Sequence, residues 1–408
     1  MKILVVTQYF WPEQFRINDL VKGLIERGNE VTVLTGCPNY PNGKIFNGYG
    51  IFNRPETHEG AKVIRVPMLP RGNGSGLRLG FNYLSFALSA SLLGPILCRG
   101  DYDAIFVFQA SPVTVGIPAI VMKWFKQAPI LFWIVDLWPD SLAATGAIKS
   151  DRILRGTDHL IKWIYSHCKK IMYSSKGFLE SLSEKSPRYA SLAYFPNWIE
   201  PEMGSNEELP ISLPDGFKII FAGNIGVSQD FETILTAAER VADLRDIKWI
   251  ILGDGRMAPW VKEEVTKRNL SNCFHLLGQF PSTTMPAFFS AADALLVTLL
   301  PEPVFALTVP GKVQSYLACG RPIIAALNGE GAALIHESTG GLAVAAGDVE
   351  GLANAVRKVH AFSREKRDEM GRNGKIYAND HFDRELLFDR LDGWIQEAVS
   401  SNSKTRNK

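Results

Sequence analysis

The strongest constraint on the fold is a strand-then-helix pattern that runs along the chain in two series. The short apolar runs of the first series lie near residues 2–7, 30–35, 62–66, 103–108, 130–135 and 170–174. Those of the second series lie at residues 217–223, 247–253, 273–278, 294–299 and 321–327. Strands that alternate with helices form parallel sheets covered on both faces. The sequence therefore predicts an α/β protein with two doubly wound, Rossmann-like parallel sheets facing a cleft.

The segment between the two series separates two domains. Residues 194–216 contain four prolines, two glycines and no periodicity, which is typical of an interdomain linker. We expect an N-terminal domain at 1–200, a C-terminal domain at 201–380, and a final helix at 381–408 that crosses back to the first domain. Ligands of such sheets bind outside the carboxyl ends of the strands.

Composition and cysteine spacing narrow the class of protein. With 46% apolar and 21% charged residues, the chain has the composition of a soluble globular protein. Its five cysteines lie far apart without a CxxC or Cys/His cluster, so neither a disulfide framework nor a structural zinc site is expected. The first apolar run meets Pro12 and Glu13 and is interpreted as a strand, not as a signal peptide. These features indicate the cytoplasm.

Charge is divided unevenly along the chain. Residues 1–200 hold 22 Lys and Arg against 15 Asp and Glu, whereas residues 201–408 hold 22 against 27. The basic half suggests a negatively charged partner. No stretch interleaves basic and aromatic residues, so nucleic acid is not expected as a partner. The oligomeric state is left open.

Residues 81–98 form a long stretch without charge. Asn82, three serines and a Gly-Pro pair argue against a membrane span. Two alternatives remain: a helix buried against the first sheet, or a helix half-exposed to a bilayer surface. In the second case, lipid phosphates would meet the flanking arginines Arg71, Arg78 and Arg99.

Several turns of the second half fall at predicted strand ends. In "FAGNIGVSQDFETIL", Gly223 and Gly226 allow close backbone approach, and the helix that begins near Asp230 offers N–H groups to an anion. "LGDGR", Gly253 to Arg256, is a turn of the same kind, and a flat base could rest on the turn that contains Gln279. Ordinary βα turns are also rich in glycine. The spacing is not GxGxxG, so a nicotinamide site is not supported.

The stretch "PEPVFALTVPGKVQSYLACGRPI", residues 301–323, holds one lysine among apolar and small residues. Lys312 follows a Pro-Gly pair where a loop becomes a helix. Either it meets an anion at the helix N-terminus, or it is a solvated lysine at the start of a helix. We favour the anion because the surroundings are apolar.

Taken together, these stretches resemble retaining glycosyltransferases of the GT-B fold, the large GT4 group, over nearly the whole chain. The branch that is most similar assembles bacterial polysaccharides and includes fucosyl and N-acetylfucosaminyl transferases. In the first half the resemblance rests on "QYFWPE", "RGNEVTVLTGCPNYPNG" and "DLWPDSLAATG". In the second half it rests on "PNWIE", "GNIGVSQDFETIL" and "PGKVQSYLACGRPI".

The resemblance implies a donor site in the second domain, with departures from the family pattern. The Arg and Lys that many members place in the first turn fall here on Asn224 and Gln229, and their two glutamates fall on Leu307 and Ser315. Lys312 is then the remaining cation for the donor diphosphate, aided by a helix N-terminus near residue 310 and backbone N–H groups of residues 305–308. Ser315 would reach the ribose. The expected donor-binding residues are Gly223, Asn224, Gly226, Gly253, Arg256, Gln279, Phe305, Ala306, Leu307, Thr308, Lys312 and Ser315.

The first domain would bring the acceptor. Arg16, after the first strand, could contact a diphosphate, and the ring of Tyr40 could stack on a sugar. Asp136 lies at a strand end, where carboxylates of doubly wound domains often serve the active site. Asp136 and Glu302 are the candidate catalytic carboxylates, which would orient a hydroxyl or take a proton. Arg16 as a surface residue and Tyr40 as a loop-packing residue are the alternatives.

The resemblance also implies the reaction. Retaining members are described without a protein nucleophile and mostly without a bound metal, and the chain has no suitably placed DxD motif. The expected donor is a UDP-sugar, with L-FucNAc or a related N-acetylated deoxyhexose, and GDP-fucose remains an alternative. The expected acceptor is an undecaprenyl-diphosphate-linked saccharide of O-antigen, lipopolysaccharide or capsule biosynthesis, at the inner face of the cell membrane. A nucleotide-sugar epimerase and a sugar-binding protein are the competing hypotheses.

Overall fold

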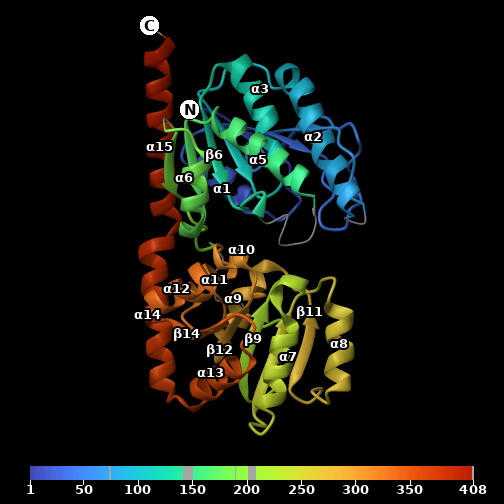
Figure 1. The fold of residues 1–408 in the computed structure, drawn as a ribbon, viewed down its shortest axis with the longest axis vertical. Helices are drawn as coiled ribbons and strands as arrows, with labels where there is room; N and C mark the ends of the chain where they lie inside the picture. Colours follow the sequence, from blue (N-terminus) through green and yellow to red (C-terminus); the bar gives the residue numbers. More distant parts are fainter. Residues whose placement is uncertain (73–74, 141–149, 189, 201–207, 407–408) are drawn as a thin grey trace. The chain divides into compact units, whose positions relative to one another are not determined.

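The computed structural model describes residues 1–72, 75–140, 150–188, 190–200 and 208–406, and it divides the chain into two compact units. Unit 1 comprises Met1–Pro196 with the C-terminal segment from Phe388, and unit 2 comprises Asn197–Leu387. Each unit is a parallel sheet with helices packed on it (Figure 1). Since the two units are described separately, the predicted cleft between them stays a prediction.

The sheet of unit 1 has eight strands in the order β3-β4-β2-β1-β5-β6-β7-β8. Every pairing is parallel except that of β3 with β4. The strands are β1 (Lys2–Val6), β2 (Glu30–Gly36), β3 (Glu56–His58), β4 (Ala61–Val66), β5 (Ala104–Gln109), β6 (Ile130–Ile134), β7 (Lys170–Tyr173) and β8 (Ser191–Tyr194). The described helices between them are α1 (Arg16–Glu26), α2 (Gly76–Leu97), α3 (Gly116–Lys126), α5 (Asp151–Tyr165) and α6 (Leu179–Lys185).

The sheet of unit 2 has six parallel strands in the order β11-β10-β9-β12-β13-β14. These are β9 (Phe217–Ala222), β10 (Ile247–Leu252), β11 (Phe274–Gly278), β12 (Ala294–Thr298), β13 (Ile323–Ala326) and β14 (Gly341–Val344). The helices are α7 (Phe231–Arg240), α8 (Ala258–Lys267), α9 (Met285–Ser290), α10 (Pro303–Ala306), α11 (Lys312–Cys319), α12 (Gly329–Glu337), α13 (Val349–Ala361) and α14 (Arg364–Phe382). Alternate side chains of each strand enter two separate cores, one on each face of the sheet, as a doubly wound sheet requires.

The predicted fold class is confirmed. Each apolar run of the two series is a strand, and α1 is followed by Gly28 in the left-handed conformation (φ +79°) that a helix C-terminus favours. The sequence analysis missed β3, β8 and β14. These strands lie at sheet edges, are three or four residues long, and are mostly only half-buried. They therefore lack the continuous apolar run that marks a central parallel strand.

The C-terminal helix α15 (Arg384–Arg406) packs on unit 1 from Phe388 onward. Phe388, Leu391 and Ile395 are fully buried in it. The Lys170 ammonium lies 3.3 Å from the Glu397 carboxylate, and the Asn402 side chain donates to the carbonyl of Gln127 at 2.8 Å. Since burial of apolar side chains dominates such docking, the helix is part of the core of unit 1 and not an appendage.

Substitution of Ile395 by alanine should destabilise unit 1. The change removes a fully buried side chain and leaves a cavity between α15 and the sheet, so the free energy of unfolding should fall by about 2–4 kcal/mol. The exposed neighbour Gln396→Ala is the control and should change it by less than about 0.5 kcal/mol. Urea denaturation followed by tryptophan fluorescence measures both, and equal stabilities would mean that α15 does not dock.

The uncharged stretch at 81–98 lies in α2 up to Leu97, and the two sides of this helix differ in burial. Asn82, Phe86 and Ala90 are fully buried on the inner side, whereas a row of large apolar side chains on the outer side is exposed. Among the described residues, α2 is the one helix long and apolar enough to cross a bilayer by length and composition, with 28% of its apolar window buried. The helix thus packs against the protein on one side, as the first alternative required, and is exposed on the other, while its contact with a bilayer stays a prediction.

Candidate functional site

Three glycine turns lie next to one another at the carboxyl ends of β9, β10 and β11. Gly223 donates its N–H to Leu252 O at 2.9 Å, and Gly253 donates to Gly278 O at 2.7 Å. All three glycines have positive φ, with Gly223 and Gly253 at +140°. A Cβ on Gly253 would lie 1.9 Å from Gly223 O, so only glycine permits this approach. The turns form a continuous strip of backbone at the edge where ligands of doubly wound sheets bind.

The start of α7, for which the sequence left an anion site and an ordinary βα turn as alternatives, carries a side-chain cap. The N-cap residue Asp230 accepts from Thr233 Oγ1 at 2.6 Å and from Thr233 N at 3.4 Å. Its carboxylate is buried and lies where an anion would meet the first turn of the helix. The N-terminus of α7 is therefore already capped by a negative charge.

Lys312, the first residue of α11, lies beside the glycine turns. Tyr316, one turn along α11, accepts a hydrogen bond from Ala222 N at 2.8 Å and thereby ties the helix to the end of β9. The Lys312 Nζ atom lies 3.2 Å from the position of a Cβ on Gly223, so a side chain there would press on the ammonium. The sequence identified Lys312 but gave no sign of Tyr316, whose role depends on the packing of α11 against β9.

The ammonium of Lys312 has no acidic partner among the described residues. It donates to Gln229 Oε1 at 2.8 Å and lies 3.7 Å from the centroid of the Phe221 ring. Burial lowers the pKa of Lys312 to about 7, because nothing negative offsets the loss of water. Lys312 is therefore not a solvated helix-start lysine. It is a desolvated cation held by two neutral groups at the carboxyl edge of the sheet.

The sequence analysis assigned no role to Gln229. It stands where the resemblance placed a basic side chain, and it accepts a hydrogen bond from the cation instead. Its segment is fixed by Leu300, whose N–H donates to Ser228 O at 3.0 Å. The departure from the family pattern at this position was the feature of the sequence that could have identified Gln229.

The loop before α11 differs from the prediction. The N–H groups of Phe305 and Ala306 donate to Glu302 O, and those of Leu307 and Thr308 donate to carbonyls of the same turn. The expectation of free backbone donors at residues 305–308 is therefore wrong. Glu302 itself is exposed at the N-cap position of α10 without a side-chain cap bond. Ser315 is only 5% exposed on α11, so its contact with a ribose stays a prediction.

The remaining donor-site candidates surround the glycine strip. Asn224 is exposed, and its side-chain amide lies over Gly226 and Gly255, 2.5–2.6 Å from where Cβ atoms on those residues would be. Arg256 and Gln279 are exposed after β10 and β11, at the same edge of the sheet. The structure thus brings Gly223, Asn224, Gly226, Gly253 and Lys312 together, and leaves Arg256 and Gln279 at the rim.

In unit 1, the buried Glu13 organises the loops that follow β1 and β2. Its carboxylate accepts the N–H groups of Asn39 at 2.8 Å, Tyr40 at 2.7 Å and Phe10 at 3.3 Å. Burial raises the pKa of Glu13 to about 7 against the effect of these hydrogen bonds. Glu13 was treated only as the end of a strand in the sequence, yet it positions the Tyr40 loop.

The candidate acceptor residues lie at the carboxyl edge of unit 1. The Tyr40 ring packs 5.1 Å from that of Phe15, and the Arg71 guanidinium lies 4.8 Å over it. Arg16 is the first residue of α1 and is half-buried. The Asp136 carboxylate, just after β6, accepts from Trp138 Nε1 at 3.0 Å. These residues share one edge of the sheet, but their contact with an acceptor stays a prediction.

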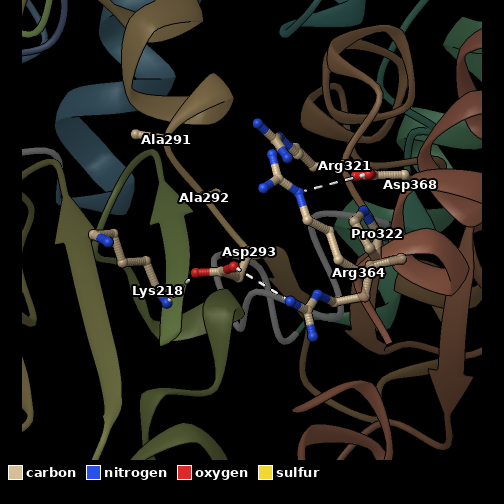
Figure 2. A pocket seen from close by; sticks show the side chains of 9 residues that line it. Lys218, Ala291, Ala292, Asp293, Arg321, Pro322, Arg364 and Asp368 are labelled. Carbon is tan, nitrogen blue, oxygen red and sulfur yellow. Dashed lines mark hydrogen bonds and ion pairs between the residues drawn. The ribbon is translucent and has the colours of Figure 1, made fainter. Parts of the chain in front are cut away.

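A cavity of about 310 Å³ in unit 2 is not this site. Figure 2 shows that Asp293 lies between Lys218 and an arginine, and that Arg364 faces Asp368. Asp293 accepts from Lys218 N at 2.9 Å and lies 3.9 Å from Arg367. Lys218, Asp293 and Arg321 stand at the amino ends of β9, β12 and β13, the edge opposite the glycine turns. Four cations and two carboxylates line this cavity, so part of its positive charge is not neutralised within it.

Comparison with known proteins agrees with this geometry. Residues 216–361 match the family described as glycosyl transferases group 1, and residues 14–198 match the glycosyl transferase 4-like domain. The chain is a group 1 glycosyltransferase. The two matches meet near the boundary between units 1 and 2.

The transferase is similar to named relatives over different lengths. It is 24% identical to WcaI of Escherichia coli K12, named as a colanic acid biosynthesis glycosyl transferase, over 78% of this chain and 82% of the relative. It is 28% identical to the glycosyltransferase WbjE of Pseudomonas aeruginosa, over 52% of this chain and 55% of the relative. The crystal structure of HepE from Anabaena with UDP aligns with a TM-score of 0.67 and 14% identity, over 97% and 100% of the chains. The last likeness shows the GT-B fold.

Replacing Lys312 by methionine should stabilise the ligand-free transferase near neutral pH. The folded state lowers the pKa of Lys312 from 10.5 to about 7, so the cost of charging it is complete below about pH 7 and disappears as pH rises to 10.5. At about pH 6, we expect the free energy of unfolding of Lys312→Met to exceed that of wild type by ~1–3 kcal/mol. The difference should shrink above pH 7. Lys262→Met, at an exposed lysine, is the control. A gain independent of pH would argue against desolvation as the cause.

Proposed function

We propose that this transferase is a retaining enzyme that moves a sugar from a UDP-sugar to an undecaprenyl-diphosphate-linked saccharide during assembly of a bacterial surface polysaccharide. The observation that carries the donor half is the desolvated Lys312 beside the glycine strip. A diphosphate would supply the negative charge that this cation lacks, and backbone at Gly223 and Gly253 allows close approach. The UDP complex of HepE and the name of WcaI support the class of donor and of pathway.

The chemistry follows from the charge that develops on the leaving diphosphate. As the glycosidic bond to the donor breaks, negative charge builds on the oxygen next to the sugar, and a cation in a water-poor site stabilises it more than it would in water. Bound diphosphate favours the ammonium form of Lys312, whose pKa is about 7 in the free protein. Asp136 and Glu302 are the carboxylates proposed to orient the acceptor hydroxyl or take its proton.

The proposal has alternatives for the donor sugar and for the activity. An N-acetylated deoxyhexose such as L-FucNAc is the first choice, and GDP-fucose the alternative. An epimerase would need acid and base groups at the donor edge. Two strongly desolvated groups of that edge are Lys312 and Tyr316, and the Tyr316 hydroxyl is engaged by Ala222 N. Lys312 is then a single cation, which suits the charge of a leaving diphosphate.

A thermal-shift panel of UDP, GDP, CMP, dTDP and NAD tests the donor site. UDP at about one hundred times its dissociation constant should add ~2.7 kcal/mol to the free energy of unfolding. The shift should vanish in Lys312→Ala and persist in Lys262→Ala. A shift with GDP alone would assign the alternative donor. A UDP shift that survives Lys312→Ala would remove Lys312 from the site, and no nucleotide shift at all would refute the proposal.

Transfer is expected to proceed without a bound metal ion. Lys312 would supply the positive charge that a divalent ion supplies in metal-dependent transferases, so turnover with a UDP-sugar should be within about twofold of its normal value in millimolar EDTA. The measurement is release of UDP in the presence of a lipid-linked acceptor. Loss of activity in EDTA and its recovery with Mg²⁺ would contradict metal independence while leaving the UDP site intact.

A further inference from the structure

The outer face of α2 is apolar along its whole length. Six large side chains at intervals of three or four residues are 60–81% exposed, and they line one side of the helix. They are Leu77, Phe81, Leu84, Leu88, Leu92 and Ile96. Single exposed apolar residues are ordinary, but a continuous row on one helix marks an interaction surface.

The inner face of α2 carries the polar groups. Asn82 is fully buried, accepts from Gln8 Nε2 at 2.7 Å and donates to Leu69 O at 2.6 Å. Ser85 Oγ accepts from Leu69 N at 2.9 Å, and Ser89 Oγ donates to Pro67 O. The helix therefore buries Asn82 together with apolar residues such as Phe86 on its inner side, while the row of large side chains on its outer side is apolar. A helix that water surrounds places polar residues on its outer face instead.

The neighbouring helix α3 extends the surface. Gly94 of α2 allows close contact, since a Cβ there would lie 3.1 Å from the sulfur of Met122 on α3. Phe125, one turn after Met122 on the same side of α3, is 68% exposed. Lys126 Nζ donates to Gly100 O at 2.9 Å, which places this cation at the end of α2.

The charges around this surface are mostly positive. Residues 60–100 and 104–135 contain no Asp or Glu, and their cations include the exposed Arg78 and Arg99 near the two ends of α2. Asp101 and Asp103 lie between the two ranges, and Asp103 accepts from Lys2 N at 2.7 Å. An apolar strip with cations at its ends complements a bilayer whose headgroups carry negative charge.

We propose that the outer face of α2, with Phe125 of α3, is a membrane-docking surface that lies in the interface of an anionic bilayer. The apolar side chains enter the acyl region, while Arg78, Arg99 and Lys126 contact phosphate groups. The helix does not span, because leaving the sheet would break the buried hydrogen bonds of Asn82. The inference rests on the proposed function in one respect: a polyprenyl-linked acceptor is presented at such a surface.

Flotation with vesicles tests the surface on the full-length chain. Wild type should bind vesicles of phosphatidylglycerol and phosphatidylethanolamine, and Leu88→Ser should weaken the apparent affinity about tenfold. Leu84→Ser/Leu88→Ser should weaken it about one hundredfold. Ile376→Ser, at a residue 60% exposed on α14 of unit 2, is the matched control and should bind like wild type. Arg78→Gln/Arg99→Gln should weaken binding to these vesicles about tenfold without affecting the weaker binding to phosphatidylcholine alone.

Four results would overturn the surface. The first two are no vesicle binding by wild type and equal binding by Leu84→Ser/Leu88→Ser. The third is resistance of bound wild type to extraction by alkaline carbonate, which a spanning helix would show. The fourth is a dimer in sedimentation that the double substitution dissociates. Leu92→Ser/Ile96→Ser provides a second variant if the first pair lowers the unfolding midpoint. UDP shifts on the same preparations separate the two proposals: a UDP shift without vesicle binding overturns the docking surface alone, and vesicle binding without a UDP shift overturns the nucleotide site alone.

Discussion

A cation with no acidic partner among the described residues is the constraint on which the carboxyl edge of the unit 2 sheet depends. The lowered pKa of Lys312 corresponds to a cost of up to about 5 kcal/mol for keeping the ammonium charged, and less to the extent that water still reaches it. The Gln229 amide and the Phe221 ring offset part of that cost, since a carbonyl dipole and a ring face both attract a cation. Neither neutralises it. A carboxylate at Gln229 would make the edge more stable and would also occupy the place of a diphosphate.

The surrounding backbone is arranged around the same atom. Tyr316 fixes α11 to the end of β9, and the glycine at 223 leaves room for the ammonium above the strand end. Gly253 then closes against Gly223, so the second turn supports the first. Backbone hydrogen bonds between neighbouring strand ends hold the strip in place without a ligand. Such preorganisation reduces the entropy that binding costs, and it explains why three successive strand ends carry glycine with positive φ.

The sequence predicted what depends on local pattern and missed what depends on packing. The central strands are uninterrupted apolar runs, so both sheets could be read from the chain, whereas the edge strand β14 has no such run. Lys312 stood out because it is a lone cation, but its contacts with Phe221 and Gln229 join it to residues far away in sequence. The helix that begins near Asp230 was expected to offer N–H groups to an anion, with an ordinary βα turn as the alternative. Only the structure shows the Asp230 carboxylate occupying the helix end.

The burial of α2 is a second feature that depends on packing and that the sequence pattern could not decide. A uniformly apolar stretch has no periodicity that could distinguish its two sides, so the sequence left a buried helix and a surface helix as alternatives. The few polar residues were counted against a membrane span. In the structure Asn82, Ser85 and Ser89 bond to other segments of unit 1, so their side chains do not interrupt the apolar row on the outer side of the helix. The polar side chains hold the helix to the rest of unit 1 through hydrogen bonds. The exposed side chains of the row are apolar, so their burial is favourable only in an apolar environment.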